Sequence, residues 1–238
     1  MAKHIIHTAD SRGHADHGWL KTYHSFSFAN YFNPERVHFG ALRVLNDDYI
    51  AGSMGFGMHP HNNMEIVSIP LKGTLSHQDS MESKGTIQKG EIQIMSAGTG
   101  VFHSEVNASE HEAVTLLQIW VIPNRTNVTP RYGQMNYQLK QNELKTLIQP
   151  TPSEDTLWLH QDAWFKLAKF DAKQAIKIPV EMPETNGLYL FVIEGKISVN
   201  ENVLETRDAI GIWETEEISV ETLTDTEFLI IEIPMLTE

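Results

Sequence analysis

The chain has 238 residues, no cysteine and a formal net charge of −13, and 41% of its residues are hydrophobic. A chain of this length buries roughly 70% of the surface that it exposes when unfolded, so it does not depend on disulfides for a stable core. The negative charge argues against direct binding to nucleic acid, because proteins that bind it carry a basic surface.

The N-terminal region, residues 1–54, begins without the apolar core of a signal peptide. The whole chain also lacks an apolar run near the roughly 18 residues of a membrane span, so we expect a cytoplasmic protein that does not bind membranes. Short strand-like runs such as HFGALRVLN alternate with polar segments. Asn46-Asp47-Asp48 is interpreted as a turn, because Asn and Asp favour turns.

Residues 17–31, HGWLKTYHSFSFANY, are rich in aromatic side chains and histidine. The favoured interpretation is a strand with one packed aromatic face. The alternative is that part of this segment lines or covers a ligand pocket.

The stretch from Gly55 to Asn107 contains further strands separated by glycine turns. EIVSIPL and EIQIM have the β-branched or alternating residues of strands, and LKGT and QKGE have the composition of turns between them. Residues 113–122, AVTLLQIWVI, form an apolar run that we interpret as a buried strand closing a first β-barrel.

Two short clusters in this stretch, His59-Pro-His61 and His103-Ser-Glu105, have the composition of metal ligands. Residues i and i+2 of a strand share one face, so each pair points to one side of its strand. On facing strands they would surround one point with three imidazoles and a carboxylate, a set that suits a divalent metal and leaves positions open for a substrate oxygen or O2. Glu65 competes with Glu105 as the carboxylate ligand, since it has the right parity after His61, and the spacing does not choose between them.

His77 and Asp79 follow the first cluster and are interpreted mainly as polar residues at a strand end. Their alternative role is to support metal ligands, because a ligating histidine usually donates its second ring N–H to a partner. All histidines except His160 precede Glu112, so we expect a single metal in the N-terminal half.

The C-terminal part repeats the strand rhythm without the ligands. Residues 124–150 are interpreted as a connector in which LKQNELKTLIQP forms a short helical piece, and EDTLWLHQDAWFKLAKF as two strands. LYLFVIEGKISVN then repeats the pattern of MEIVSIPLKGTLSH. We therefore predict an all-β protein of two antiparallel barrels with few short helices, divided into an N-terminal metal-binding domain (1–123), a connector (124–150) and a C-terminal domain without metal ligands (151–238).

The motifs resemble a known family. The pattern Gly55…His59-x-His61-x3-Glu65…Gly73, followed by Gly90…Gly98-Thr-Gly100-x2-His103-x3-Asn107, is similar to the two cupin motifs. The segments RGHADHGWLKTYHSFSFANYF, HPHNNMEI, HQDS, IMSAGTGVFHSE and TPRY together resemble the pirin family, especially its bacterial quercetinase-like members. This resemblance extends over nearly the whole chain.

The resemblance implies a bicupin fold and assigns His59, His61, His103 and Glu105 as the metal ligands, with Glu65 outside the ligand set. It implies one divalent ion, with Fe expected and Ni, Cu, Co, Mn or Zn compatible with the same ligands. The implied activity is that of a quercetin 2,3-dioxygenase, which cleaves a flavonol such as quercetin with O2 and releases carbon monoxide, with Glu105 as ligand and base.

Two other functions stay open at this point. One is a pirin-like regulatory or interaction protein that binds a protein partner and whose metal is structural or redox-sensing. The other is a sugar or acid isomerase that uses the same ligands with a metal that is not redox-active.

Overall fold

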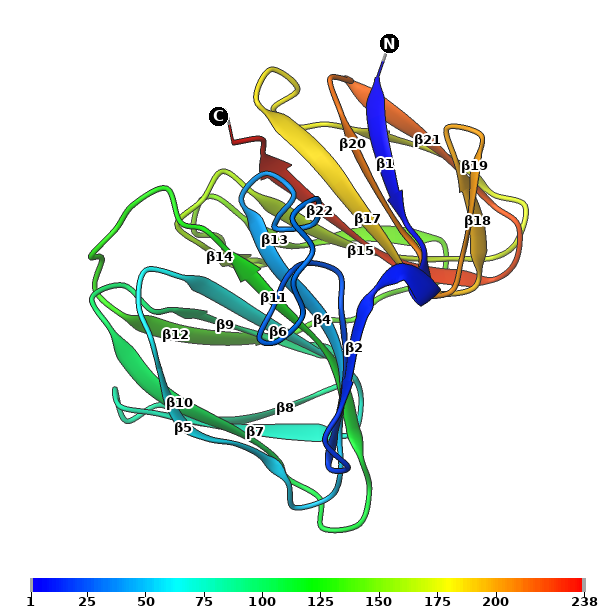
Figure 1. Cartoon of the computed structure of the whole chain (residues 1–238). Coiled ribbons are helices and arrows are strands. Elements are labelled where there is room, and N and C mark those ends of the chain that lie inside the picture. Colours follow the sequence, from blue (N-terminus) through cyan, green and yellow to red (C-terminus); the bar gives the residue numbers. More distant parts are fainter. Residues whose placement is uncertain (1, 237–238) are drawn as a thin grey trace.

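The computed structural model describes residues 2–236, which fold almost entirely into β-strands (Figure 1). The described helical structure is one short 3-10 helix, Ala9–Ser11. Each half of the chain contains a seven-stranded sheet and a four-stranded sheet. The predicted all-β fold with two cupin-like barrels is therefore confirmed. No helix in this part of the chain is long and apolar enough to cross a membrane.

The N-terminal half consists of two facing sheets. In spatial order, the seven-stranded sheet contains β12 (Arg131–Asn136), β9 (Glu91–Ser96), β6 (Glu65–Lys72), β11 (Val114–Val121), β4 (Leu42–Ile50), β3 (Leu20–His24) and β2 (Gly13–Asp16). The four-stranded sheet contains β5 (Gly55–His61), β10 (Val101–Asn107), β7 (Thr74–Asp79) and β8 (Lys84–Gln88).

The C-terminal half has the same plan. Its seven-stranded sheet contains β1 (Lys3–His7), β20 (Ala209–Trp213), β17 (Asn186–Glu194), β22 (Thr226–Pro234), β15 (Trp164–Phe170), β13 (Glu143–Gln149) and β14 (Leu157–Trp158). Its four-stranded sheet contains β16 (Ala175–Pro179), β21 (Glu217–Thr222), β18 (Lys196–Val199) and β19 (Asn202–Glu205).

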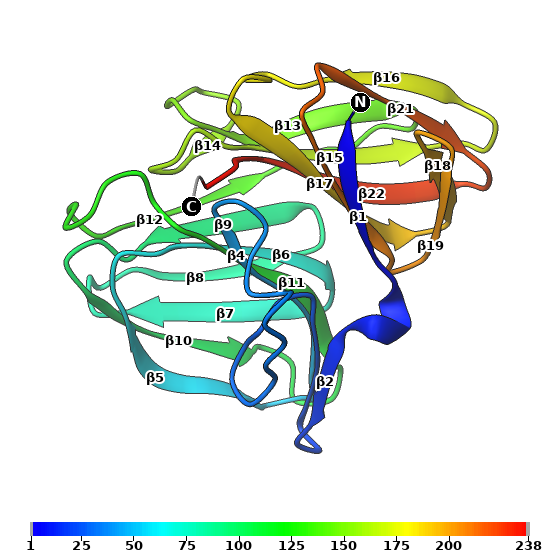
Figure 2. The same ribbon diagram turned by 45° about the horizontal axis from the view of Figure 1, so that its top comes forward.

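The chain crosses between the two halves at its first strand. β1 pairs with β20, so the first strand of the chain lies in the C-terminal sheet, as both views of the ribbon show (Figures 1 and 2). β12, which lies in the predicted connector, pairs instead with β9 of the N-terminal sheet. These strands occupy equivalent edge positions, so neither sheet is built entirely from the sequence range that we predicted for its domain.

The two halves share a hydrophobic core between their large sheets. This core includes Val67 and Ile119 of the N-terminal sheet and Phe165 and Leu229 of the C-terminal sheet, all fully buried. Burial of apolar surface at ~25 cal/mol per Å² stabilises the stacked arrangement. The barrels are therefore held together by core packing as well as by the crossing strand.

Glycine turns mark the repeat that the sequence predicts. Gly73 joins β6 to β7 with φ +77°, and Gly195 joins β17 to β18 with φ +98°. A Cβ at either position would also collide with a backbone carbonyl, that of Ala113 or of Asp225. Glycine is required at both turns because it alone combines a positive φ with such a close approach.

Two predictions of local structure are wrong. LKQNELKTLIQP, predicted as a short helical piece, contains strand β13. The register of β13 against β15 shifts between Thr146 and Ile148, and Leu147 and Ile148 are both buried. Such a bulge interrupts the two-residue alternation of a strand, so the apolar residues acquire a spacing that resembles a helix.

Asn46-Asp47-Asp48, predicted as a turn, lies inside β4, a nine-residue strand. β4 is flanked on both sides, by β3 and β11. Asn46 and Asp48 are buried, whereas turn residues normally lie at the surface. Pairing with both neighbours fixes an extended backbone here and overrides the local preference of Asn and Asp.

Candidate metal centre and cavity

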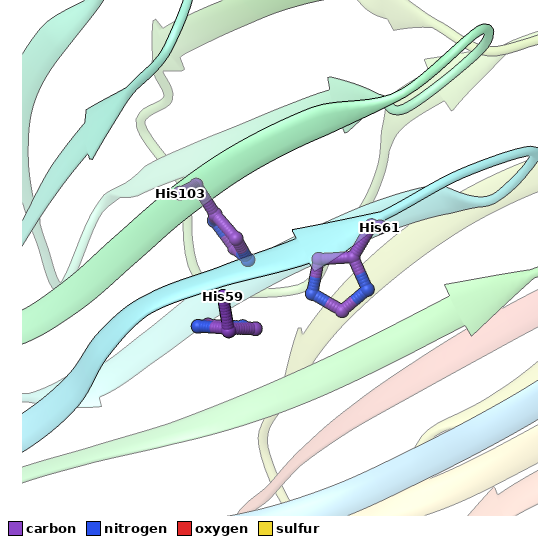
Figure 3. A group of neighbouring side chains, drawn as sticks. All are labelled: His59, His61 and His103. Carbon is purple, nitrogen blue, oxygen red and sulfur yellow. The ribbon is translucent and has the colours of Figure 1, made fainter.

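Three of the predicted ligands converge in the N-terminal barrel. β5 and β10 are antiparallel neighbours, and His103 lies directly opposite His59 in their register. The ring centroids of His59 and His103 are 4.4 Å apart, and that of His61 is 4.8 Å from each. The side chains point toward one another from the two strands (Figure 3). One ring nitrogen from each lies within 4.8 Å of the others, so the three histidines could hold a metal ion.

Strand alternation explains why these side chains meet. On β10 the residues Val101, His103, Glu105 and Asn107 are buried, and the residues between them are not. The register against β5 also shifts between His103 and Glu105. The i, i+2 spacing therefore places His103 and Glu105 on the interior face, as the sequence predicts.

The imidazoles have the charge state and the free nitrogens that a metal needs. Burial, followed by the neighbouring rings of His59 and His61, lowers the pKa of His103 to about 2. Burial and then His59 lower the pKa of His61 to about 4. Both nitrogens of the buried His103 lack a hydrogen-bond partner within residues 2–236, which is costly unless another group binds them. Neutral imidazoles are the form that ligates metals, so this cluster fits a divalent ion.

The geometry also defines which nitrogen of His59 is free. Its Nδ1 lies 2.7 Å from the carbonyl oxygen of Gly57. A carbonyl can only accept, so Nδ1 carries the proton and Nε2 is left with a lone pair.

Glu105 lies beside this group but belongs to a second, overlapping one. One oxygen of Glu105 lies within 4.8 Å of ring nitrogens of His77 and His103. Its Oε1 accepts hydrogen bonds from Ser68 Oγ at 3.0 Å and Gln93 Nε2 at 2.6 Å, and its Oε2 accepts one from Gln118 Nε2 at 2.5 Å. The four predicted ligands are thus divided between two groups that share His103, and the carboxylate is held by three neutral donors.

Glu65 lies outside both groups. His61 ends β5 and Glu65 begins β6, and these strands belong to different sheets, so the two residues do not share a strand face. Glu65 Oε2 accepts a hydrogen bond from Ser96 Oγ at 2.7 Å. Burial raises the pKa of Glu65, and this hydrogen bond opposes the increase.

His77 and Asp79 form a pair behind the first group. His77 Nε2 lies 3.1 Å from Asp79 Oδ2, and the His77 ring stacks on Tyr132 at 4.5 Å. Asp79 Oδ1 accepts the backbone N–H groups of Met81 and Ser83. The pair is therefore fixed in position next to His103, whose ring centroid is 5.4 Å from that of His77.

A cavity of about 650 Å³ opens on His59, His61 and Glu105. Its volume is within the ~300–1,000 Å³ typical of small-molecule sites. Five of its lining side chains are aromatic: Trp19, Phe28, Tyr31, Phe56 and Trp120. Among the described residues that line it, none is lysine or arginine. The site therefore suits an uncharged, planar aromatic ligand.

The aromatic segment 17–31 supplies much of this lining. This agrees with the alternative interpretation, in which part of the segment lines a ligand pocket. β3 is a strand, as the favoured interpretation requires, but its aromatic and histidine neighbours face the cavity. Sequence reasoning missed the polar lining residues Asn46, Asp48 and Gln118. The sequence pattern that could have revealed them is a polar residue at alternate positions of an otherwise apolar strand, because such residues share one face and indicate a polar interior.

Among the described residues, two cupin-type barrels, one of which holds overlapping ligand groups that share His103 beside an aromatic cavity, define a bicupin protein with a candidate metal site. Residues 5–121 match the Pirin family, and residues 146–233 match the quercetinase C-terminal cupin domain. The chain belongs to the pirin family.

Similar proteins cover nearly its whole length. "Quercetin 2,3-dioxygenase" of Escherichia coli is 40% identical over 230 residues, which are 96% of this chain and 98% of that protein. "Pirin-like protein" of Caulobacter vibrioides is 35% identical over 94% of this chain and 96% of that protein. The crystal structure of the bacterial pirin YhhW from Escherichia coli in complex with nickel(II) has a TM-score of 0.93 and 37% identity, and the match covers 98% of this chain and 100% of that chain.

Proposed function

We propose that this protein is a metal-dependent dioxygenase that cleaves a flavonol such as quercetin with O2 and releases carbon monoxide. The observation that carries the proposal is that the histidine group lies beside an aromatic cavity whose described lining residues include neither lysine nor arginine. Flavonols are planar, uncharged and rich in hydroxyl groups, so they fit this chemistry. The names of several relatives agree with the proposal.

His59, His61, His103 and Glu105 would hold one divalent ion, with Fe as the expected metal. Nickel occupies a related pirin, and the same ligands also suit Cu, Co, Mn and Zn. When bound, such a metal lowers the pKa of a coordinated hydroxyl and offers a position for O2.

Glu105 would accept the proton of the flavonol hydroxyl at one of its carboxylate oxygens. Gln93 and Gln118 donate to the carboxylate and fix its orientation at the cavity wall. A positioned base of this kind contributes typically 10²–10⁴-fold to a rate. Trp19, Phe56 and Trp120 would stack on the flavonol rings and exclude water from them.

The lining disfavours an isomerase of acids or sugar phosphates. Such substrates carry a negative charge that proteins usually bind with arginine or lysine. The described lining residues include neither.

The test is an aerobic turnover assay on metal-defined protein. The chain is stripped with chelator, reloaded anaerobically with Fe(II) or another divalent ion, and then mixed with quercetin and air. We expect quercetin absorbance to fall with release of one carbon monoxide per molecule consumed. The His59→Ala/His61→Ala double variant should be inactive, and His160→Ala, which alters a histidine outside the site, should be active. Absence of carbon monoxide with every metal would refute the proposal.

A further inference from the structure

We propose that Asp48 is a second carboxyl group of the cavity and hydrogen-bonds directly to a ring hydroxyl of the bound ligand, at a wall formed by β3 and β4. The ligand would then be an aromatic molecule with one oxygen directed to the histidines and a further hydroxyl directed to Asp48. The identity of this ligand as a flavonol rests on the proposed function, whereas the contact itself rests on the geometry described below.

Asp48 belongs to the cavity wall by its place in the sheet. It lies in β4, paired with Thr22 of β3 and Leu116 of β11. It lines the same cavity as His59 and His61 and is only 4% exposed. Its carboxyl group is therefore both withdrawn from bulk water and adjacent to the space that a ligand would fill.

The hydrogen bonding of Asp48 is incomplete. Its Oδ1 is buried and has no partner among the described residues. The nearby Asn46 uses its side-chain oxygen to bind His24 Nδ1 at 2.9 Å. A buried polar atom without a partner is destabilising, and a hydrogen bond from a ligand hydroxyl would remove that penalty.

The neighbouring Asp47 shows how the charge of an aspartate is compensated elsewhere in this strand. Asp47 Oδ2 lies 3.6 Å from Arg12 Nη1 and 3.3 Å from Arg207 Nε, so its charge is compensated. Asp48 is in no ion pair found within residues 2–236. Two adjacent carboxyl groups on opposite faces of one strand thus differ in their ion pairing: Asp47 lies beside two arginines, whereas Asp48 faces the cavity without an ion pair among the described residues.

The other barrel shows that the fold does not need a carboxyl here. Asp48 pairs with Leu116 of β11, and in the C-terminal barrel Ala168 pairs with Phe228 of β22 at the equivalent position. Ala168 is fully buried within an apolar core. The same strand position is therefore compatible with a small apolar side chain, so the backbone plan does not require a carboxyl group there.

The charge state of Asp48 suits a hydroxyl partner. Burial raises the pKa of Asp48 to about 7; the hydrogen bond with Thr22 opposes this shift, and the charges of Asp47 and Glu105 add to it. A carboxyl group in either protonation state can bind a hydroxyl, since the protonated form donates to it and the ionised form accepts from it. An aromatic ring without a hydroxyl would satisfy neither form.

The experiment compares two ligands that differ at the distal ring hydroxyls. Quercetin and 3-hydroxyflavone share the carbonyl and the adjacent hydroxyl, and 3-hydroxyflavone lacks the others. Binding to metal-loaded protein without O2 is followed by quenching of tryptophan fluorescence, because Trp19 and Trp120 line the cavity. We expect Asp48→Ala to weaken quercetin binding about 10-fold and 3-hydroxyflavone binding less than about 3-fold. Asp48→Asn keeps a hydrogen-bond donor and an acceptor, so its affinity for both ligands should stay close to that of the wild type.

The matched control is Asp16→Asn, an exposed aspartate of the same sheet that does not line the cavity. It should bind both ligands as the wild type does. Equal weakening of both ligands by Asp48→Ala, or no weakening, would overturn the contact. An infrared difference spectrum gives an independent readout: quercetin should shift a carboxyl band in wild type that is missing in Asp48→Asn, and an unshifted band would also overturn it.

The outcomes separate this inference from the proposed function. If the wild type binds quercetin through Asp48 but releases no carbon monoxide in air, the proposed dioxygenase activity is refuted and the proposed contact of Asp48 still holds. If the wild type turns quercetin over and Asp48→Ala binds quercetin as tightly as the wild type does, the proposed contact is refuted and the proposed dioxygenase activity still holds. Wild type that binds neither ligand would refute both.

Discussion

The two barrels have the same strand order and opposite interiors. The four-stranded sheet β5-β10-β7-β8 of the N-terminal half corresponds to β16-β21-β18-β19 of the C-terminal half. β10 directs His103 and Glu105 inward, whereas its counterpart β21 directs Ile218 and Val220 inward. The same backbone plan therefore encloses a polar site in one half and an apolar core in the other.

The difference has an energetic consequence. The C-terminal barrel contains one continuous apolar cluster that includes Leu190, Ile218 and Ile230. In the N-terminal barrel the apolar residues form two smaller clusters, one around Leu75 and Ile87 and one around Ile66, Met95 and Val101. Apolar burial stabilises a fold without further requirements, but buried polar groups need hydrogen bonds or a metal. Apart from the shared core, the C-terminal interior is therefore filled by apolar packing, and the N-terminal interior contains the candidate site.

The largest expected effect is on metal content. We expect purified protein to bind one divalent ion per chain, and His59→Ala/His61→Ala to lose it, because two of three clustered imidazoles are removed. Metal analysis after gel filtration measures this, with His160→Ala as the control that keeps its metal. Two tightly bound ions per chain, or full retention in the double variant, would contradict a site confined to the N-terminal barrel.

The next effect is on catalysis by the two buried glutamates. Glu105→Gln should keep the shape of the site and some metal, since an amide oxygen can still coordinate, but an amide cannot accept the flavonol proton. We expect a loss of roughly 10²–10⁴-fold in carbon monoxide release per bound metal. Glu65→Gln should lose much less, because Glu65 binds Ser96 outside the histidine groups. The reverse order of effects would assign the ligand carboxylate to Glu65.

The third effect tests the apolar barrel. Ile230 and Gln118 occupy equivalent places in the two barrels. Ile230 pairs with Leu190, which lies five residues before the turn at Gly195. Gln118 pairs with Ser68, which lies five residues before the turn at Gly73. Ile230→Gln buries an amide without partners in an apolar cluster, so we expect a loss of roughly 3 kcal/mol in the free energy of unfolding. Denaturant unfolding measures it.

Ile230→Leu is the control, and it should cost less than about 1.5 kcal/mol because it conserves volume and polarity. An Ile230→Gln variant as stable as Ile230→Leu would show that the C-terminal interior also tolerates polar groups, and the contrast between the barrels would then not be energetic.

Local sequence patterns predict the parts of this fold that depend on neighbouring residues. Alternation and the turns at Gly73 and Gly195 predict the strands, and the i, i+2 spacing predicts that His103 and Glu105 share a face. Non-local pairing is what these patterns miss. The strand through Asn46 and Asp48 resembles a turn until β3 and β11 are placed beside it.

The surroundings of Glu105 could not be predicted for the same reason. Its hydrogen-bond donors Ser68, Gln93 and Gln118 come from three different strands of the opposite sheet. The exchange of β1 and β12 between the halves likewise depends on which sheet edge is free after folding. Spacing along the chain contains no information about either arrangement.

The effect that is smallest at neutral pH, and grows only in acid, concerns the boundary between the barrels, where His7 of β1 is buried. His7 Nδ1 lies 2.9 Å from the Tyr189 hydroxyl, and its Nε2 has no partner among the described residues. Burial, and then the charge of Arg36, lowers the pKa of His7 to about 4 from an ordinary value of 6.5. The unfolded chain therefore takes up a proton below pH 6.5, while the folded chain does not until about pH 4. Folding stability is retained above pH 6.5 and lost as the pH falls through this window, by up to about 3 kcal/mol for His7 alone.

His7→Gln should remove this contribution, because glutamine keeps a polar contact with Tyr189 but does not titrate. The measurement is the free energy of unfolding of metal-free protein between pH 8 and 4, taken as the difference between variant and wild type, so that the contributions of His61 and His103 cancel. We expect the free energy of unfolding of the variant to rise relative to that of the wild type as the pH falls. Ile5→Val, an exposed change on the same strand that involves no titratable group, should give a constant difference. Parallel curves for His7→Gln and wild type would show that the junction between the barrels does not sense pH, and acid sensitivity would then belong to the polar N-terminal interior alone.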